Sequence, residues 1–154
     1  MVSGAELVEW RAAAPGLVEL AGVGRTMRRV LRLQTAESVL VAEVTPNYFA
    51  TLGRAAVAGR TFTPGAAGGL RAVVFTDRAW RRLFGPDLSS AGREVASVKL
   101  DEETVAVMGV VRADDSLGAD PDVFLAIDEG AASFLDRTRR DFFCGIARLA
   151  SGAE

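Results

Sequence analysis

The sequence predicts an α+β domain, in which a mixed sheet with helices forms one part and a second part is richer in strands. Three observations lead to this prediction. Apolar residues make up 49% and charged residues 25% of the 154 residues, as in ordinary globular proteins, so we expect one folded domain. Stretches with apolar side chains at helical spacing are mixed with stretches in which apolar and polar side chains alternate. The run Ala72–Phe75 is continuously apolar, which is typical of a central strand buried on both faces.

The chain begins with a predicted helix that is followed by strands. Ser3 and Glu6 form a capping box at the start of the helix, and Pro15-Gly16 stops it. Trp10 is one of the residues that this helix should bury. Alternating arginine and apolar residues then indicate a half-buried strand with its arginines outward. The strands are expected at Leu17–Gly22, Arg28–Leu33 and Ser38–Val44.

A short helix is expected after these strands. Thr45 is its predicted cap, Pro46 its first residue, and Gly53 ends it. Its inward-facing side chains are predicted to be Tyr48, Phe49 and Leu52. The segment Gly59–Pro64 is predicted to be a turn, and Gly65–Gly69 a flexible loop.

A second helix should follow the buried strand. Thr76-Asp77 is its predicted cap, and Gly85-Pro86 ends it. Trp80 and Phe84 lie four residues apart, so they should form an aromatic stripe on the face that packs against the core.

The remainder of the chain is predicted to be richer in strands. Glu94–Leu100 and Thr104–Val111 flank the acidic turn Asp101–Glu103 and should form a hairpin. An acidic loop, a strand, a short helix and a last strand are expected at Arg112–Pro121, Asp122–Ile127, Gly130–Leu135 and Phe142–Leu149.

The composition excludes several kinds of chemistry. The sequence has no histidine, so it cannot form a Ser-His-Asp triad or a His-ligated metal site. Cys144 is the only cysteine, which excludes an intrachain disulfide and a Cys-rich zinc site. With 18 basic and 20 acidic residues the net charge is −2, without the basic excess of nucleic-acid binders. We therefore expect no catalytic residue, no metal, no cofactor and no nucleic-acid partner.

The sequence also has no targeting or membrane-spanning stretch of the usual kind. No apolar run approaches the roughly 20 residues that cross a bilayer as a helix. The N-terminal residues lack the positive region and the hydrophobic core of a signal peptide. If the domain works outside the cytoplasm, we expect its targeting sequence to lie elsewhere.

The charged and glycine-rich stretches are interpreted as surface features. The acidic residues lack EF-hand spacing, so solvated carboxylates are favoured over a calcium site, and no pairing suggests a carboxylate hydrolase. These residues are Asp101, Glu102, Glu103, Asp114, Asp115, Asp120 and Asp122. Gly65–Gly69 lacks the Lys-Ser/Thr ending of a phosphate-binding loop. The arginine pairs at 28–29, 81–82 and 139–140 favour a salt-bridged, solvated face over a lipid-headgroup patch.

Several short stretches, taken together and in order, are typical of one protein family. They are Trp10-Arg11, Val44–Phe49, Gly59–Thr63, Trp80–Gly85, Gly92-Arg93, Val107–Val111, Asp122–Leu125 and Arg148–Gly152. In this order and spacing they resemble the MacB-like periplasmic core domain of ABC transporter permeases, the MacB/FtsX-type permease family. The resemblance runs from about Trp10 to Gly152, which is nearly the whole chain.

The residues of these stretches are expected to have architectural roles. Glycines should occupy positions that need a positive φ or a close backbone approach, and the Arg60 guanidinium should bind carbonyls or a carboxylate near the following turn. The structural motif consists of Trp10, Asn47, Tyr48, Phe49, Gly53, Gly59, Arg60, Phe62, Trp80, Phe84, Gly85 and Gly109.

The resemblance implies an organisation and a function. It implies a porter-like α/β part at about 1–90, a Sabre-like strand-rich part at 91–130 and a shortened return segment at 131–154. It also implies a non-catalytic extracytoplasmic domain, at the periplasm or the outer face of the cytoplasmic membrane. Membrane helices absent from this sequence would anchor it, and a cytoplasmic ATPase subunit or domain would drive it. An adaptor or substrate protein would be its docking partner.

Three alternatives stay open from the sequence. An unpaired sheet edge at the shortened end would favour a homodimer. The domain could instead be a binding module for a small apolar or peptidic substrate. A stand-alone carboxylate-based hydrolase or transferase is the least favoured alternative.

Overall fold

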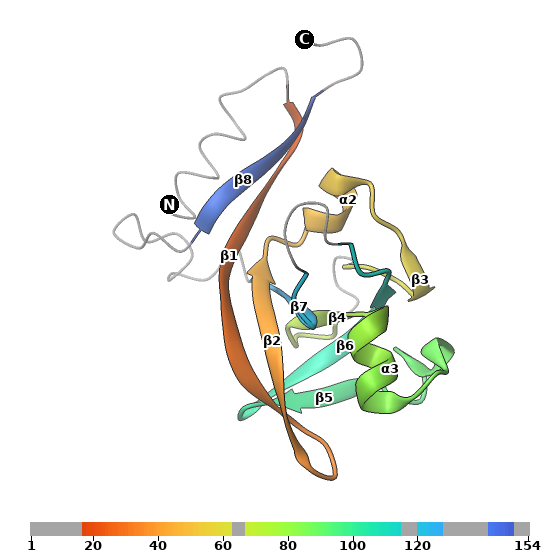
Figure 1. The fold of residues 1–154 in the computed structure, drawn as a ribbon. Coiled ribbons are helices and arrows are strands. Elements are labelled where there is room, and N and C mark those ends of the chain that lie inside the picture. The colour runs from red at the N-terminus through yellow and green to blue at the C-terminus, as the bar shows by residue number, and fades with distance from the viewer. Residues whose placement is uncertain (1–16, 63–66, 115–119, 128–141, 150–154) are drawn as a thin grey trace. The chain divides into compact units, whose positions relative to one another are not determined.

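The computed structural model describes residues 17–62, 67–114, 120–127 and 142–149 (Figure 1). The chain forms two compact units that interleave along the sequence. One unit contains Met1–Arg25, Glu43–Arg54 and Ile127–Glu154, and the other contains Thr26–Ala42 and Ala55–Ala126. The predicted helices at 3–14 and 130–135, with Trp10, lie outside the described residues.

The first unit contains a long antiparallel ribbon and a short helix. The first part of β1 (Leu17–Arg32) pairs with β8 (Phe142–Leu149), from Leu17 opposite Leu149 to Gly24 opposite Phe142. Helix α2 (Tyr48–Leu52) ends at Gly53, which has a φ of 69°. The predicted last strand is thus confirmed, and so is the end of this helix.

The second unit contains a closed ring of strands with one branch. Its members are the later part of β1, β2 (Ala36–Val44), β4 (Ala72–Thr76), β5 (Ser97–Leu100), β6 (Glu103–Val111) and β7 (Val123–Ala126). Neighbours follow the order β2-β7-β4-β6-β5-β1, and β1 also pairs with β2, which closes the ring. Strand β4 runs parallel to β6, whereas β4–β7, β5–β6 and β1–β5 are antiparallel. The branch is β3 (Ala56–Gly59), which among the described strands pairs only with β6.

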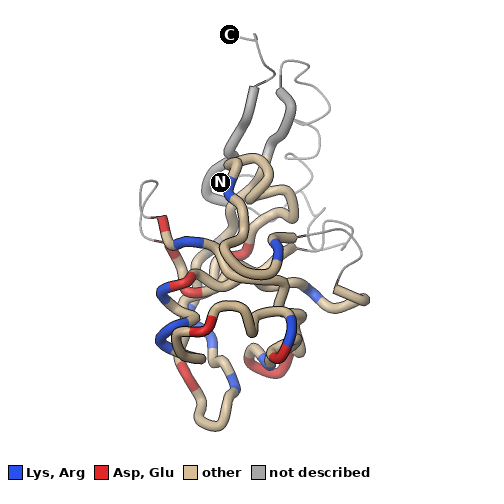
Figure 2. The backbone as a smooth tube through the Cα atoms, turned by 90° about the vertical axis from the view of Figure 1, so that its right-hand side faces the viewer, with Lys and Arg blue, Asp and Glu red and all other residues tan. Residues whose placement is uncertain are grey.

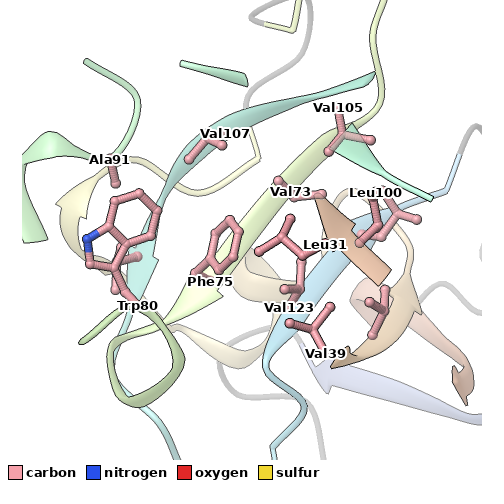
Figure 3. Close-up of a cluster of buried hydrophobic side chains, with 13 residues drawn as sticks. Leu31, Val39, Val73, Phe75, Trp80, Ala91, Leu100, Val105, Val107 and Val123 are labelled. Carbon is pink, nitrogen blue, oxygen red and sulfur yellow. The ribbon is translucent and has the colours of Figure 1, made fainter. Parts of the chain in front are cut away.

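The interior of this ring is filled by aliphatic and aromatic side chains (Figure 3). The residues that β2, β4 and β7 contribute to it are two positions apart, as the two-residue period of a strand requires. The buried cluster contains Leu31, Val39, Val41, Val73, Phe75, Trp80, Ala91, Leu100, Val105, Val107, Val110, Val123 and Leu125. All five residues of β4 are buried, so the predicted strand buried on both faces is confirmed.

Helix α3 (Asp77–Phe84) follows β4 directly and packs on the same core. The Thr76 hydroxyl accepts a hydrogen bond from the backbone N–H of Ala79 at 3.3 Å, which caps the first turn. Gly85 ends the helix, and a short 3-10 turn, η1 (Leu88–Ser90), comes next. The predicted cap, end and aromatic positions of this helix are confirmed.

Several predicted elements differ in the structure. The two strands predicted at 17–22 and 28–33 form one strand, because β1 has pairing partners near both ends and its glycines adopt extended backbone. The sequence pattern does not predict β3, whose last residue, Gly59, is expected in a turn. The hairpin of β5 and β6 is confirmed, but its turn contains only Asp101 and Glu102.

The start of α2 also differs from the prediction. The helix begins at Tyr48 with Asn47 as its N-cap, so Thr45 is not the cap. The Thr45 hydroxyl instead accepts a hydrogen bond from the Gly22 N–H at 3.0 Å. Tyr48 and Phe49 are buried as predicted, but Thr51 is the third buried residue and Leu52 is only half-buried.

Candidate functional site

The motif residues of the first unit form a tight turn that leads into α2. The Thr45 hydroxyl donates to Oδ1 of Asn47 at 2.7 Å while it accepts the Gly22 N–H. Tyr48 and Phe49 contact each other edge to face, with ring centroids 5.2 Å apart. The Arg54 guanidinium lies over the Phe49 ring, 5.5 Å from its centroid, at a distance suited to a cation–π contact. These contacts position the turn and α2.

Three glycines meet where β3 pairs with β6. A Cβ on Gly109 would overlap the backbone of Ala58 and Arg60, and a Cβ on Gly59 would lie 2.5 Å from the Met108 carbonyl oxygen. A Cβ on Gly92 would lie 3.0 Å from the same oxygen. Gly59 also has a φ of 65°, a conformation that L-residues rarely adopt. The structure therefore brings Gly59 and Gly109 together and adds Gly92, which is not among the predicted site residues.

The aromatic motif residues form one cluster in the second unit. The Trp80 and Phe84 rings are stacked with centroids 4.1 Å apart, and Phe75 meets Trp80 edge-on at 5.2 Å. The Trp80 indole N–H donates to the Asp87 carbonyl oxygen at 3.1 Å. This bond satisfies the polar atom of a fully buried ring, as buried tryptophans generally require.

The remaining motif residues, Arg60, Phe62 and Gly85, contribute no side chain to the contacts described above. Arg60 is exposed, and its backbone N–H donates to the Met108 carbonyl oxygen at 3.1 Å. Within the described part of the chain its guanidinium forms no ion pair. Phe62 is half-buried, and Gly85 ends α3 with a φ of 102°.

A network of ion pairs surrounds the β5–β6 turn and is not evident from the sequence pattern. Arg29 Nε donates to Asp101 Oδ2 at 2.6 Å, and Arg71 donates to both oxygens of Glu103 at 2.7 and 2.8 Å. Arg32 pairs with Glu102 at 3.0 Å. Hydrogen bonds from Arg29 lower the pKa of Asp101, and those from Arg71 lower the pKa of Glu103. These carboxylates are therefore partners of arginines distant in sequence, and the expected salt-bridged face is present at Arg29.

Two more aspartates, Asp122 and Asp77, accept hydrogen bonds from backbone N–H groups of other segments. Asp122 accepts the Leu40 N–H at 2.9 Å and pairs with Arg82 at 3.2 Å, and its side chain is only 17% exposed. The prediction that Asp122 is a solvated loop carboxylate is therefore wrong, because β7 carries it against β2. Burial raises the pKa of Asp77, but hydrogen bonds from the Ala113 and Arg78 backbones and from Arg81 outweigh this, so its pKa is lowered.

The described residues show no arrangement typical of a metal site. Among them, no group of three or more histidine, cysteine, aspartate or glutamate residues is placed to hold an ion. Basic and acidic residues are interspersed along the described backbone (Figure 2). No helix in the described ranges is both long enough and apolar enough to span a membrane.

Comparison with known proteins identifies the family. The chain matches the family model of the MacB-like periplasmic core domain over residues 2–154. A comparison with curated proteins gave no match.

Two solved structures share the fold. The extracellular domain of the noncanonic ABC-type transporter YknZ from Gram-positive bacteria is 18% identical, with a TM-score of 0.66 over 96% of this chain and 73% of that chain. The periplasmic region of MacB from Actinobacillus actinomycetemcomitans is 14% identical, with a TM-score of 0.69 over 100% of this chain and 67% of that chain. The family match over nearly the whole length, supported by this common fold, shows that the chain belongs to the family of MacB-like periplasmic core domains of ABC transporter permeases.

Proposed function

We propose that this chain is a non-catalytic extracytoplasmic domain that transmits ATP-driven movement within an ABC transporter permease. Membrane helices and a cytoplasmic ATPase supply the movement, and an adaptor or substrate protein receives it. The observation that carries the proposal is the family match over residues 2–154. The expected location is the periplasm or the outer face of the cytoplasmic membrane.

The construction of the second unit supports a mechanical role. Its strands close into a ring, and the interior contains a packed apolar cluster. Close-packed protein interiors have low compressibility, so a displacement applied at one end is passed on with little deformation. The bidentate Arg71–Glu103 pair and the Arg29–Asp101 pair fasten the β5–β6 turn to its neighbours.

The electrostatics of the described acids support a non-catalytic role. A general acid at neutral pH needs a pKa raised toward 7. The carboxyl groups of Asp77, Asp87, Asp101 and Glu103 instead have pKa values lowered by hydrogen bonds within the fold. They remain charged at neutral pH as partners of backbone N–H groups, hydroxyls and arginines, which suits a structural role.

Finer features of the family are proposed with the same function. We assign the porter-like part to about 1–90, the Sabre-like part to 91–130 and the return segment to 131–154. A homodimer in isolation, through an unpaired sheet edge, stays an alternative to a single copy.

Distances between spin labels test the mechanical proposal. The permease, with its native membrane helices and ATPase, is reconstituted in lipid after Cys144→Ser removes the thiol of this domain and any other accessible cysteines are replaced. A label at Thr104→Cys, an exposed residue of β6, reports the distance between two copies of the domain. We expect this distance to differ between the ADP-bound and the ATP-bound assembly.

A second pair of labels provides the internal control. Val57→Cys, an exposed residue of β3, and Thr104→Cys lie in the same unit, and this variant is diluted with unlabelled permease so that only the distance within one domain is measured. This distance should stay constant between nucleotide states. An unchanged distance between copies, or full ATP-driven activity after Trp80→Ala has unfolded the domain, would contradict the proposal. Saturable thermal stabilisation by small apolar compounds would favour the ligand-binding alternative instead.

A further inference from the structure

The ring of the second unit is closed by the hairpin of β1 and β2 (Figure 1). We define its segment Thr26–Ala42 as the strap. One side of the strap meets β5 and the other side meets β7. We call the line of pairing between two neighbouring strands a seam. The β1–β5 seam contains only two paired positions, Leu31 opposite Leu100 and Arg32 opposite Lys99. By comparison, β4 and β6 are paired over five positions.

An aspartate side chain lengthens the β1–β5 seam. Asp101 directly follows β5, and its backbone N–H donates to the Val30 carbonyl oxygen at 2.7 Å. In return, the Val30 N–H donates to the Asp101 carboxylate at 3.1 Å, where a strand would offer a carbonyl oxygen. Arg29 binds the other carboxylate oxygen at 2.6 Å, and Arg32 binds the Asp101 carbonyl oxygen at 3.2 Å. The seam thus depends on one carboxylate for its last reciprocal pair.

On the opposite side of the strap, an aspartate carboxylate likewise accepts a backbone N–H across the β2–β7 seam. Asp122 directly precedes β7, and its backbone N–H donates to the Leu40 carbonyl oxygen at 2.8 Å. The Leu40 N–H donates to the Asp122 carboxylate at 2.9 Å. Arg82 of α3 pairs with this carboxylate at 3.2 Å. Both edges of the strap are therefore held by an aspartate that stands just outside a four-residue strand.

The strap also covers the apolar interior of the ring. Leu31, Val39 and Val41 are its buried contributions to the core. In the same cluster lie residues of the other strands, among them Val73 and Phe75, which Figure 3 shows close to Leu31. Movement of the strap away from β5 and β7 would uncover this interior, while the central pairing of β4 with β6 could stay intact.

We propose that the strap is a movable closure of the ring, which opens as one unit at the β1–β5 and β2–β7 seams, and that Asp101 and Asp122 hold it shut. The β1–β5 seam has only two paired positions, and short seams open at lower free energy than long ones, because local opening breaks only the bonds of that segment. The two aspartates therefore set how often the interior becomes accessible. This inference concerns the internal motion of the domain and does not depend on the proposed transport role.

Native-state amide hydrogen exchange of the whole chain tests the proposal without any substitution. In the wild type, strap amides should exchange through openings that depend less on added denaturant than global unfolding does, because opening of the strap exposes less surface than unfolding of the whole unit. Amides of β4 and β6 should exchange through openings that depend strongly on denaturant. If strap and sheet amides exchange with the same free energy and the same denaturant dependence, the strap does not move separately and the proposal is overturned.

Matched variants then test the role of the two carboxylates. Asp101→Asn and Asp122→Asn keep a hydrogen-bond acceptor but remove the charge, and asparagine tolerates the positive φ of 53° at residue 101. Each variant should accelerate strap exchange about fivefold to tenfold relative to β4 and β6, as expected for the loss of one charge-assisted bond. Asp87→Asn is the control, because Asp87 caps η1 in the same unit and does not contact the strap. Equal acceleration of all strands by the strap variants would overturn the assignment of Asp101 and Asp122.

Discussion

At the scale of single residues, the close antiparallel pairing of β3 with β6 decides which side chains the chain can tolerate at the paired positions. Gly59 and Gly109 are paired with each other in the β3–β6 register, and neither has room for a Cβ. The backbone of β6 is also irregular here, since its register to β4 shifts between Val73 and Val74. Glycine at these positions allows two backbones to approach closely, which is a steric requirement and not a catalytic one.

Gly109→Ala tests this steric requirement. Its new methyl group would overlap the backbone of Ala58 and Arg60, and backbone cannot rotate away as a side chain can. We expect the free energy of unfolding to fall by about 3 kcal/mol, at the upper end of the usual cost of overpacking. Urea denaturation followed by tryptophan fluorescence measures this loss.

Gly68→Ala provides the comparison for that measurement. Gly68 has a φ of 61°, but the space that a methyl group would occupy there is open, so only backbone strain of about 1–2 kcal/mol is expected. A loss for Gly109→Ala no larger than that for Gly68→Ala would show that β3 and β6 can separate at little cost.

At the scale of elements, α3 and β4 are joined by a single residue that belongs to both. Thr76 is the last residue of β4 and the N-cap of α3, and it is fully buried. Its backbone N–H donates to the Asp122 carbonyl oxygen at 3.1 Å, while its hydroxyl caps the helix. The direction of α3, and with it the position of Trp80 on the core, therefore depends on this junction.

Thr76→Ala should weaken the junction. The substitution leaves a helix N–H without its side-chain acceptor, so we expect a loss of about 1 kcal/mol in the free energy of unfolding. Thr76→Ser keeps the hydroxyl and should recover most of the loss. Thr104→Ala on the exposed face of β6 should change stability by less than about 0.5 kcal/mol. Thermal unfolding followed by circular dichroism distinguishes the three variants, and equal melting temperatures would rule out a capping role.

At the scale of the whole molecule, carboxylates connect segments that are far apart in sequence. Arg71 donates a hydrogen bond to Glu103, and Arg29 donates one to Asp101. The Asp122 carboxylate accepts the backbone N–H of Leu40. Each lowered carboxyl pKa links folding to pH, because the folded state binds the proton less tightly than the unfolded state does. The stabilisation is therefore complete above the ordinary pKa values of 3.8 for Asp101 and 4.5 for Glu103. It is lost as the pH falls through the lower values of the folded state.

Glu103→Gln should reduce this pH dependence. At pH 7 the variant should be less stable by about 1 kcal/mol, a value that allows for solvent screening because the Glu103 side chain is 35% exposed. Below the ordinary pKa of 4.5 the difference from the wild type should begin to shrink, and it should become small as the pH falls through the lowered pKa of the folded state, where the wild-type carboxyl is protonated too. Urea denaturation at several pH values measures both effects.

The carboxylate of the preceding residue, Glu102, serves as the control for the pH experiment. Glu102 is 79% exposed and pairs with a half-exposed Arg32, so Glu102→Gln should have little effect at any pH. A constant difference between Glu103→Gln and the wild type from pH 7 to pH 3 would mean that the Arg71–Glu103 pair is not linked to folding.

Local patterns in the sequence are sufficient for elements whose signals lie within a few neighbouring residues. The continuous apolar run of β4, the Thr76 cap with the aromatic spacing of α3, and the segment of β8 all follow from such patterns. The family resemblance also comes from sequence alone, because it depends on the order of short motifs. In each case the physical cause is local: residue spacing determines which face is apolar, and capping residues satisfy the free backbone groups at a helix end.

Contacts between distant segments are decided only by the tertiary structure. Four features depend on strands that are far apart in sequence and meet only in the folded chain. They are the continuity of β1, the existence of β3, the closure of the ring, and the partners of Asp101 and Asp122. An aspartate next to a strand looks the same in sequence whether it is solvated or accepts an N–H from another strand. Its role is determined when β1 and β2 are placed beside it, because the pairing of backbone groups is a property of register in three dimensions.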